Sequence, residues 1–322
     1  MRRRDLLSLP AGLLGLPLES GESETPRFPR PVRMLFGGDV MLSRHVGRVA
    51  TQQKDPAWPF REIAPVLCSA DLSFVNLESP FSDRGRRTER GMVFKAEPEM
   101  IEGLKLAGIT AVSTANNHCR DCGSYGLEFT IDWLGRNGIV PVGTGKDAAS
   151  AHAGAILERE GTRFGLLAYT YDQRNGNHTS DDDRVAMLNL EEAAADVRAM
   201  KQRADVVIVS MHAGTEYRSK PNADQIRFAR GVIDAGATLV IGHHPHVVQP
   251  VEVYKAGVIF YSLGNFVFDQ SHREDTQHGL LAEVTFDGPR LIRHQALPID
   301  IRGTVPRLAA SPRVKKAAAA AT

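Results

Sequence analysis

The stretch TLVIGHHPHVVQP, residues 238–250, places three histidines within four positions directly after a short apolar run. The run has the length and β-branched content of a buried strand, so the histidines follow at a strand end. Pro245 has a fixed φ and disfavours a helical conformation for the residue before it, which predicts an extended His244-Pro245-His246. Because alternate residues of an extended chain face one side, we expect His244 and His246 to point together and His243 to point away.

Four further apolar runs end in polar side chains in the same way. They are VRMLF before Gly37-Gly38-Asp39, LSFV before Asn76-Leu77-Glu78, ITAVSTA before Asn116-Asn117-His118, and VVIVSM before His212. Helical patterns lie between the runs, and strands that alternate with helices predict a largely parallel sheet. In such a sheet the carboxyl ends of the strands share one edge, which is where ligands bind.

The side chains at this predicted edge indicate a metal site. Taken singly, an Asp or Asn after a strand is most often a turn or helix cap, and a lone His is most often a hydrogen-bonded core or surface residue. Five such strand ends together favour a shared divalent cation. Mixed oxygen and nitrogen donors suit one or two ions of Mn, Fe or Zn, and the absence of cysteine from these ends argues against structural zinc.

Composition argues against two other kinds of protein. Lys plus Arg total 39 and Asp plus Glu total 38, so a net charge of +1 gives no basis for binding nucleic acid through its phosphates. Three cysteines cannot form a disulfide framework. Cys119 and Cys122 form a CxxC, but a structural zinc site would lack half its ligands, which leaves a redox pair as the open alternative.

The two ends of the chain differ in composition from its middle. Residues 1–30 combine a basic start, an apolar stretch too short to span a bilayer and a polar linker, which predicts an export signal. Arg3-Arg4-Asp5-Leu6-Leu7 resembles a twin-arginine signal, so we expect a periplasmic or extracellular protein that contacts the membrane only transiently during export; a disordered tail is the alternative. The folded domain is expected at residues 31–302, followed by a low-complexity tail at 303–322.

Two features are expected near the end of the domain. YSLGNFVFD, residues 261–269, predicts strand, turn and strand, with Gly264 or Asn265 in a left-handed turn rather than at a substrate. The alternating segment that follows predicts a hairpin turning at Asp287-Gly288, which would add an antiparallel edge to the sheet.

Six motifs, taken in order, carry a resemblance to a known family. They are GGDVMLSR, VNLESP, ANNHCRDCGSYGL, VSMHAGTEY, GHHPHVVQPVEVY and VIFYSLGNFVFD, and together they span roughly residues 32–270. The chain resembles the CapA family of poly-γ-glutamate capsule synthesis proteins, which is related to the calcineurin-like metallophosphoesterases. The resemblance implies an α/β fold of four layers, a metallophosphoesterase-like sandwich in which two mixed β-sheets are flanked by helices and the metal site lies at one edge.

The resemblance also implies roles for individual residues. His118 is the residue that would protonate the leaving group as general acid, and Asp121 could orient its ring or simply cap a turn. The implied metal ligands are Asp39, Glu78, Asn117, His212, His244 and His246.

One position departs from the metallophosphoesterase pattern. Those enzymes usually have Asp-x-His in the first motif, whereas here Met41 follows Asp39, and a thioether is a poor ligand for such ions. One of the two metal positions is therefore weak, empty or completed by another residue. His45 is the nearest candidate in the sequence, although a surface position on a helix would explain it equally well.

Two functions from different classes fit these residues. The first is a metal-dependent hydrolase or transferase that acts on a phosphoester or an anionic polymer in poly-γ-glutamate or capsule synthesis, alongside other capsule-synthesis proteins. The second is a non-catalytic polymer-binding or assembly component on the same fold. SDRGRRTERGMVFK contributes Arg84, Arg86, Arg87, Arg90 and Lys95, which form either a solvated loop or a rim that attracts a polyanion.

Overall fold

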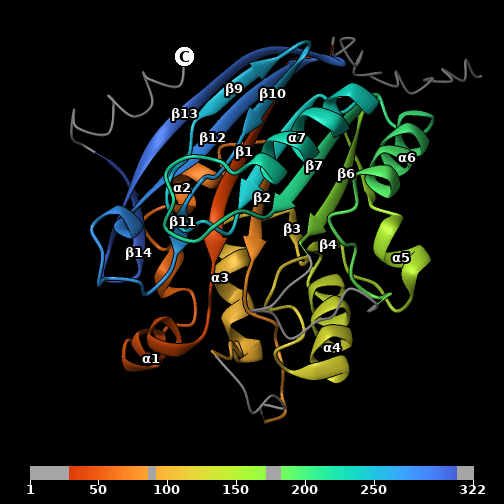
Figure 1. Cartoon of the computed structure of the whole chain (residues 1–322). Coiled ribbons are helices and arrows are strands. Elements are labelled where there is room, and N and C mark those ends of the chain that lie inside the picture. Colours follow the sequence, from red (N-terminus) through yellow and green to blue (C-terminus); the bar gives the residue numbers. More distant parts are fainter. Residues whose placement is uncertain (1–28, 86–91, 172–182, 310–322) are drawn as a thin grey trace, which may run out of the picture.

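The computed structural model describes residues 29–85, 92–171 and 183–309. Within them, two β-sheets face each other and helices cover the outer faces (Figure 1). The first sheet contains β1 (Val32–Val40), β2 (Leu72–Leu77), β3 (Ala111–Ser113), β4 (Val140–Val142), β11 (Asn265–Val267), β12 (His278–Asp287), β13 (Arg290–Arg302) and β14 (Val305–Leu308).

The strand order of this sheet is β14-β13-β12-β1-β2-β3-β4, and β11 pairs with β1 outside that path. Strands β1 to β4 are parallel, whereas β12, β13 and β14 add an antiparallel side. The predicted hairpin is confirmed, because β12 and β13 pair across a turn in which Gly288 has φ 56°. β14 lies beyond residue 302, where the sequence predicted the start of the tail.

The second sheet supplies the other half of the sandwich. It contains β5 (Ala155–Arg159), β6 (Thr162–Thr170), β7 (Val206–His212), β8 (Leu239–His243), β9 (Val251–Tyr254) and β10 (Gly257–Phe260). The order is β5-β6-β7-β8-β10-β9, with parallel strands in the centre and an antiparallel strand at each edge. The carboxyl ends of β7 and β8 are therefore adjacent.

The core between the sheets follows from the two-residue period of the strands. Met34 and Phe36 of β1 pack against the second sheet, while Leu35 between them packs toward the helices on the other side. Phe164 of β6 and Phe286 of β12 meet edge to face with ring centroids 5.3 Å apart. Both faces of the central strands are thus buried, which is why their sequences are continuously apolar.

Helices complete the four layers. Their bounds are α1 (Arg44–Gln52), α2 (Ala64–Leu67), α3 (Ile101–Leu106), α4 (Gly123–Arg136), α5 (Ala148–His152), α6 (Leu190–Lys201) and α7 (Ala223–Ala235), with 3₁₀ turns η1 (Trp58–Phe60), η2 (Pro98–Met100) and η3 (Asp275–Gln277). Helices α1 to α3 pack on the first sheet and α6 and α7 on the second (Figure 1). The two mixed sheets flanked by helices confirm the fold class predicted from the sequence.

Helix α7 shows how local sequence sets these boundaries. Asn222 accepts a hydrogen bond from the backbone N–H of Gln225, whose side chain reaches back to Asn222 as a capping box. Gly236 ends the helix at φ 117°, a conformation that favours glycine. The predicted export signal lies outside the described residues. Across the described residues, no helix has the length and apolar content that a membrane span requires.

Candidate metal centre

The carboxyl ends of strands from both sheets meet at one edge, as the sequence predicts. Asp39 lies near the end of β1, His212 ends β7 and His243 ends β8, and all three side chains are fully buried. Glu78 directly follows β2, and Asn117 follows β3. Parallel pairing within each sheet and the face-to-face contact of the sheets bring these five residues together.

Asp39 is held by neighbours from several strands. Its Oδ1 accepts a hydrogen bond from Asn76 Nδ2 at 2.8 Å, and its Oδ2 accepts one from the backbone N–H of His244 at 3.2 Å. Burial alone would raise the pKa of Asp39, but the nearby imidazoles of His243 and His246 outweigh it and hold that pKa well below its usual value. Asp39 is therefore a carboxylate aimed at the cluster.

Glu78 is the least satisfied carboxyl of the cluster. It is fully buried, and its Oε1 has no hydrogen-bond partner among the described residues. Burial raises its pKa well above the usual value, and the nearby charges of Asp39, Glu216 and Asp121 raise it further. His246 Nε2 lies 3.6 Å from Oε1. A buried, partnerless carboxyl oxygen among like charges fits a bound cation.

Hydrogen bonds fix the tautomer of His212. Asn116 Nδ2 donates to Asn76 Oδ1 at 3.2 Å, which orients the Asn76 amide so that its nitrogen lies 3.2 Å from His212 Nδ1. Nδ1 therefore accepts, and Nε2 carries the hydrogen toward Asn117 Oδ1 at 2.9 Å. Burial lowers the pKa of His212 well below its usual value, so the ring is neutral.

The His244-Pro245-His246 segment is not extended, and the conformation predicted for it is wrong. His244 has φ 96° and His246 has φ 59°, both in the left-handed region. Such backbone is strained in non-glycine residues and often marks functional sites. His244 Nε2 lies 2.7 Å from the Tyr171 hydroxyl, and His246 Nδ1 donates to Asn265 Oδ1 at 3.0 Å. Burial lowers the pKa of His244 to about 3.

His243 does not point away from the site, as the sequence argument expected. Its Nδ1 lies 3.5 Å from Asp39 Oδ1, and within the described part of the chain neither ring nitrogen has a hydrogen-bond partner. His243 ends β8, where the two-residue period places it on the same side as Leu239 and Ile241, toward the other sheet. The left-handed conformations of His244 and His246 remove the alternation beyond it, so His246 lies beside Asp39 and His244 within ligand distance of Glu216.

Two groups of side chains have the spacing that a metal ion requires. One is Asp39, Glu78 and His246, and the other is Glu216, His244 and His246; in each, one ligand atom per residue lies within 4.8 Å of the others. Sequence reasoning missed Glu216, which lies in the quoted motif VSMHAGTEY but not at a strand end. It also assigned Asn265 to a turn, although Asn265 orients His246; the turn itself contains Gly264 at φ 68°.

His118 lies beside the cluster in a fixed orientation. Its Nδ1 is 2.8 Å from Asp121 Oδ2, an oxygen that also accepts the backbone N–H of Phe94 at 2.5 Å. The Phe94 ring stacks on the imidazole with centroids 3.9 Å apart. The His118 side chain remains 10% exposed, so Nε2 is the ring nitrogen left for a substrate. This geometry suits a proton donor positioned by Asp121.

Met41 stands where the related enzymes usually have a histidine ligand, and His45 is the nearest candidate to replace it, but neither side chain reaches the cluster. Met41 is fully buried in the apolar core beneath the helices, and its sulfur accepts hydrogen bonds from Ser43 N and Oγ at 3.2 and 3.0 Å. His45 is exposed on α1, where its backbone N–H donates to Asp269. The alternative that His45 is a surface residue on a helix is therefore confirmed.

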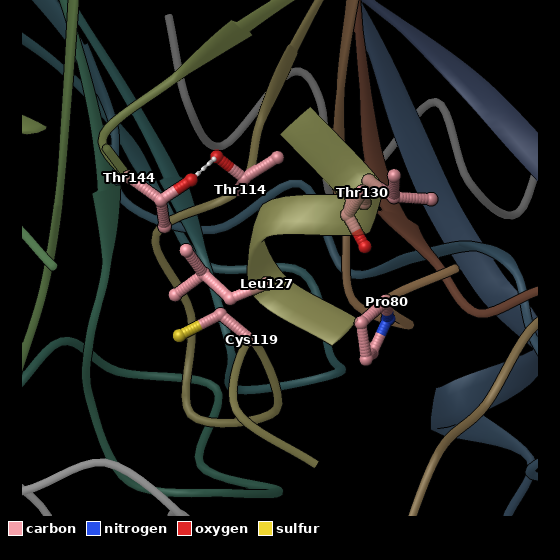
Figure 2. Close-up of a pocket in the computed structure, with 7 residues that line it drawn as sticks. Pro80, Thr114, Cys119, Leu127, Thr130 and Thr144 are labelled. Carbon is pink, nitrogen blue, oxygen red and sulfur yellow. Dashed lines mark hydrogen bonds between the residues drawn. The ribbon is translucent and has the colours of Figure 1, made fainter. Parts of the chain in front are cut away.

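The other sequence features lie around this centre. Figure 2 shows Cys119 beside Leu127, near the hydrogen bond between Thr114 and Thr144. These residues line a cavity of about 10 Å³. Such a cavity holds nothing larger than a water molecule. Cys119 and Cys122 are both buried. Of the arginine segment, Arg84 lies over the Tyr125 ring at 3.8 Å, and Arg86, Arg87 and Arg90 lie outside the described residues.

Solved structures identify the class of fold. The chain resembles a hypothetical protein from Thermus thermophilus, with a TM-score of 0.55 and 16% identity over 84% of this chain and 100% of that one. It also resembles a candidate 5′-nucleotidase from Staphylococcus aureus, solved with α-ketoglutarate, with a TM-score of 0.50 and 13% identity over 88% of this chain and 55% of that one. The fold is of the metallophosphoesterase-like, 5′-nucleotidase type.

Sequence relatives then define the family. The bacterial capsule synthesis protein family PGA_cap matches residues 33–270. The chain is 31% identical to the PGA biosynthesis protein CapA of Bacillus subtilis, over 89% of this chain and 77% of that protein. It is 33% identical to the capsule biosynthesis protein CapA of Bacillus anthracis, over 74% of this chain and 60% of that protein. The chain belongs to the CapA family of bacterial capsule synthesis proteins.

Proposed function

We propose that this protein is a metal-dependent hydrolase or transferase that acts on a phosphoester or on an amide within an anionic polymer, in poly-γ-glutamate or capsule synthesis. The polymer is suggested by the names of its relatives, which include a PGA biosynthesis protein and a probable polyglutamine synthesis accessory protein of Mycobacterium tuberculosis. The main observation in favour of a metal ion concerns Glu78. Its buried Oε1 has no hydrogen-bond partner among the described residues, and Glu78 lies at ligand spacing from Asp39 and His246.

The donor set supports one or two divalent ions of Mn, Fe or Zn. Carboxylate, amide and imidazole donors suit borderline ions at functional sites. A divalent ion bound there would acidify a water molecule and offset the charge that develops on the attacked oxygen. Of the ligands that the family resemblance implies, Asp39, Glu78, His244 and His246 belong to the groups with ligand spacing. Asn117 and His212 are hydrogen bonded to each other at 2.9 Å and would bind an ion only after that bond is broken.

His118 and Asp121 supply the proton chemistry of the proposal. With Nδ1 hydrogen bonded to Asp121, the Nε2 nitrogen of His118 can hold the proton that the leaving oxygen requires. Phe94 covers one face of the ring and fixes its plane. Asp121 acts through His118 and is a positioning residue.

The test is metal analysis combined with turnover of a phosphodiester that has an alkyl leaving group, which departs only with a proton. We expect the purified protein to contain a divalent ion and to hydrolyse the ester, and His118→Ala to keep the ion and lose most of the turnover. His45→Ala, an exposed histidine on α1, is the matched control and should behave as the wild type. Bound metal with turnover that does not depend on His118 would contradict the role of this residue.

The second candidate is a non-catalytic polymer-binding or assembly component. It is favoured by Met41, which the structure turns into the apolar core where the related enzymes usually have a histidine ligand. A protein that binds no metal and hydrolyses no ester, but binds poly-γ-glutamate in low salt, would favour this candidate. Co-purification with capsule-synthesis proteins is compatible with both.

Export is part of the proposal. An exported protein would meet capsule polymer outside the cytoplasm, and the basic, then apolar start of the sequence supports it. Cell fractionation and sequencing of the mature N-terminus test this, and an intact cytosolic Met1 would contradict it.

A further inference from the structure

The first motif supplies a single ligand to the site. Asp39 faces the cluster, but Met41 two residues later packs among apolar side chains under the helices. The Met41 sulfur accepts hydrogen bonds from the backbone N–H and the hydroxyl of Ser43. A cation beside the histidines therefore receives no second ligand from this strand, in addition to Asp39. Its replacement must come from another segment that reaches the same space.

Glu216 is on such a segment. The loop after β7 is tied to the histidine segment by a backbone hydrogen bond from Tyr217 N to Pro245 O at 2.8 Å. Tyr217 is held from the other side by Gln270, whose Nε2 donates to its hydroxyl at 3.2 Å. These contacts keep Glu216 within ligand distance of His244 and His246, all three ligand atoms lying within 4.8 Å.

His244 provides an independent sign of an absent partner. The ring is 2% exposed, its Nε2 is paired with the Tyr171 hydroxyl, and its Nδ1 has no hydrogen-bond partner in the described residues. In metal sites, one imidazole nitrogen commonly binds the ion while the other makes the hydrogen bond that orients the ring. Tyr171 would make that orienting bond here, which leaves Nδ1 as the donor.

Charge balance points the same way. Asp39, Glu78 and Glu216 bring three carboxyl groups to one partly desolvated space. In the described part of the chain, none of them forms an ion pair with lysine or arginine, and the neighbouring histidines are the only basic groups in contact. Burial without a counter-charge is costly, and divalent cations are the partners that such a set accommodates.

We propose that Glu216 replaces the ligand that the first motif lacks, so that Glu216, His244 and His246 bind a divalent cation next to the position formed by Asp39 and Glu78. This inference rests on the proposed metal-dependent function and assigns a residue that the strand-end pattern does not contain.

The experiment is a Mn²⁺ titration of the full chain by calorimetry, after removal of metal. Glu216→Gln should weaken at least one Mn²⁺ binding step by about ten-fold or more, on the scale of losses in metal sites. Glu216→Asp keeps the charge but withdraws the oxygens by one methylene, so it should also bind more weakly. Glu99→Gln removes the same charge from an exposed position of η2 and should bind as the wild type.

Thermal unfolding separates loss of a ligand from loss of the fold. In EDTA, Glu216→Gln should melt no lower than the wild type, because it removes a like charge from the cluster. With Mn²⁺, its gain in Tm should be smaller than that of the wild type. The Co²⁺ visible spectrum provides a further readout, because it reports the ligand set directly and should differ between the two proteins.

Each other outcome is decisive. If Glu216→Asp binds Mn²⁺ as the wild type and only Glu216→Gln is weakened, the charge acts at a distance and direct coordination is wrong. If both variants bind normally, Glu216 is not a ligand, and the proposed metal-dependent function still stands. If the wild type binds no Mn²⁺, Zn²⁺ or Fe²⁺, the inference and the metal-dependent function fall together.

Discussion

His118 Nδ1 lies 2.8 Å from Asp121 Oδ2, and Asp121 is itself fixed by the backbone N–H of Phe94. The pair comes from a single turn between β3 and α4, so its geometry does not depend on the loop that carries Glu216. Proton donation and cation binding are therefore separable by mutation.

If His118 protonates the leaving oxygen, its loss should depend on the leaving group. We expect His118→Ala to lower kcat by about 100-fold or more for an alkyl ester and much less for a p-nitrophenyl ester, which leaves without a proton. Asp121→Asn should show the same leaving-group pattern with a smaller loss, on the order of ten-fold, and little change in KM. Equal losses on both esters would exclude the general-acid role.

Removing the metal should destabilise the fold. Glu78 and Asp39 are buried, and a bound ion would offset their repulsion. With Mn²⁺ at about 100 times its Kd, binding stabilises the folded state by ~2.7 kcal/mol. EDTA should remove this stabilisation, and the loss should be measurable as a lower Tm. Glu78→Gln should show a smaller response to EDTA, because one of the carboxylates is already neutral. A wild-type Tm that EDTA leaves unchanged would contradict this.

Gly38 allows Asp39 to reach its position. A Cβ on Gly38 would lie 1.9 Å from the Gly264 carbonyl oxygen, which accepts the backbone N–H of Asp39 at 3.0 Å. Gly38→Ala should therefore push β1 from β11, lower the free energy of unfolding by about 1–3 kcal/mol and weaken Mn²⁺ binding.

Gly135 is the matched control for this substitution. It is exposed on α4, and a Cβ there would meet nothing within 4 Å. Gly135→Ala should stabilise the protein by about 0.5–1 kcal/mol and leave Mn²⁺ affinity unchanged. Chemical denaturation measures both variants, and a Gly38→Ala protein as stable as the wild type would show that the two strands can separate without cost.

A separate pair gives stability a pH dependence. His152 Nδ1 lies 2.7 Å from Asp196 Oδ2, which joins α5 to α6, and that hydrogen bond raises the pKa of His152 against the opposing effect of burial. A histidine with a raised folded-state pKa contributes stability that is complete below its unfolded pKa, about 6.5, and is lost as pH rises through the folded pKa.

His152→Gln should therefore destabilise the protein most at about pH 5.5, and the difference from the wild type should shrink as the pH rises through the folded-state pKa. Asp196→Asn should flatten the profile in the same way, because it removes the partner of the imidazolium. Urea unfolding across this pH range measures the effect, and a constant difference between wild type and His152→Gln would refute it.

The strand and helix pattern of the sequence predicted a largely parallel sheet and most of the residues at the edge where the site lies, and the family resemblance implied the four layers. Strand and helix periods are local properties, and parallel pairing then places Asp39 and Asn117 at one edge of the first sheet, whereas His212 joins them because the second sheet packs against the first. The hairpin at Asp287-Gly288 is local in the same sense.

Only the tertiary structure decided which side chains complete the cluster. His243 joins it because β8 directs that side chain toward the first sheet, and His244 and His246 join it through left-handed conformations that Pro245 did not predict. Glu216 reaches it because the next residue, Tyr217, donates its backbone N–H to the carbonyl oxygen of Pro245, which lies 28 residues further along the chain. Loop conformation and contacts of this range depend on the packed sheets, and no local pattern encodes them.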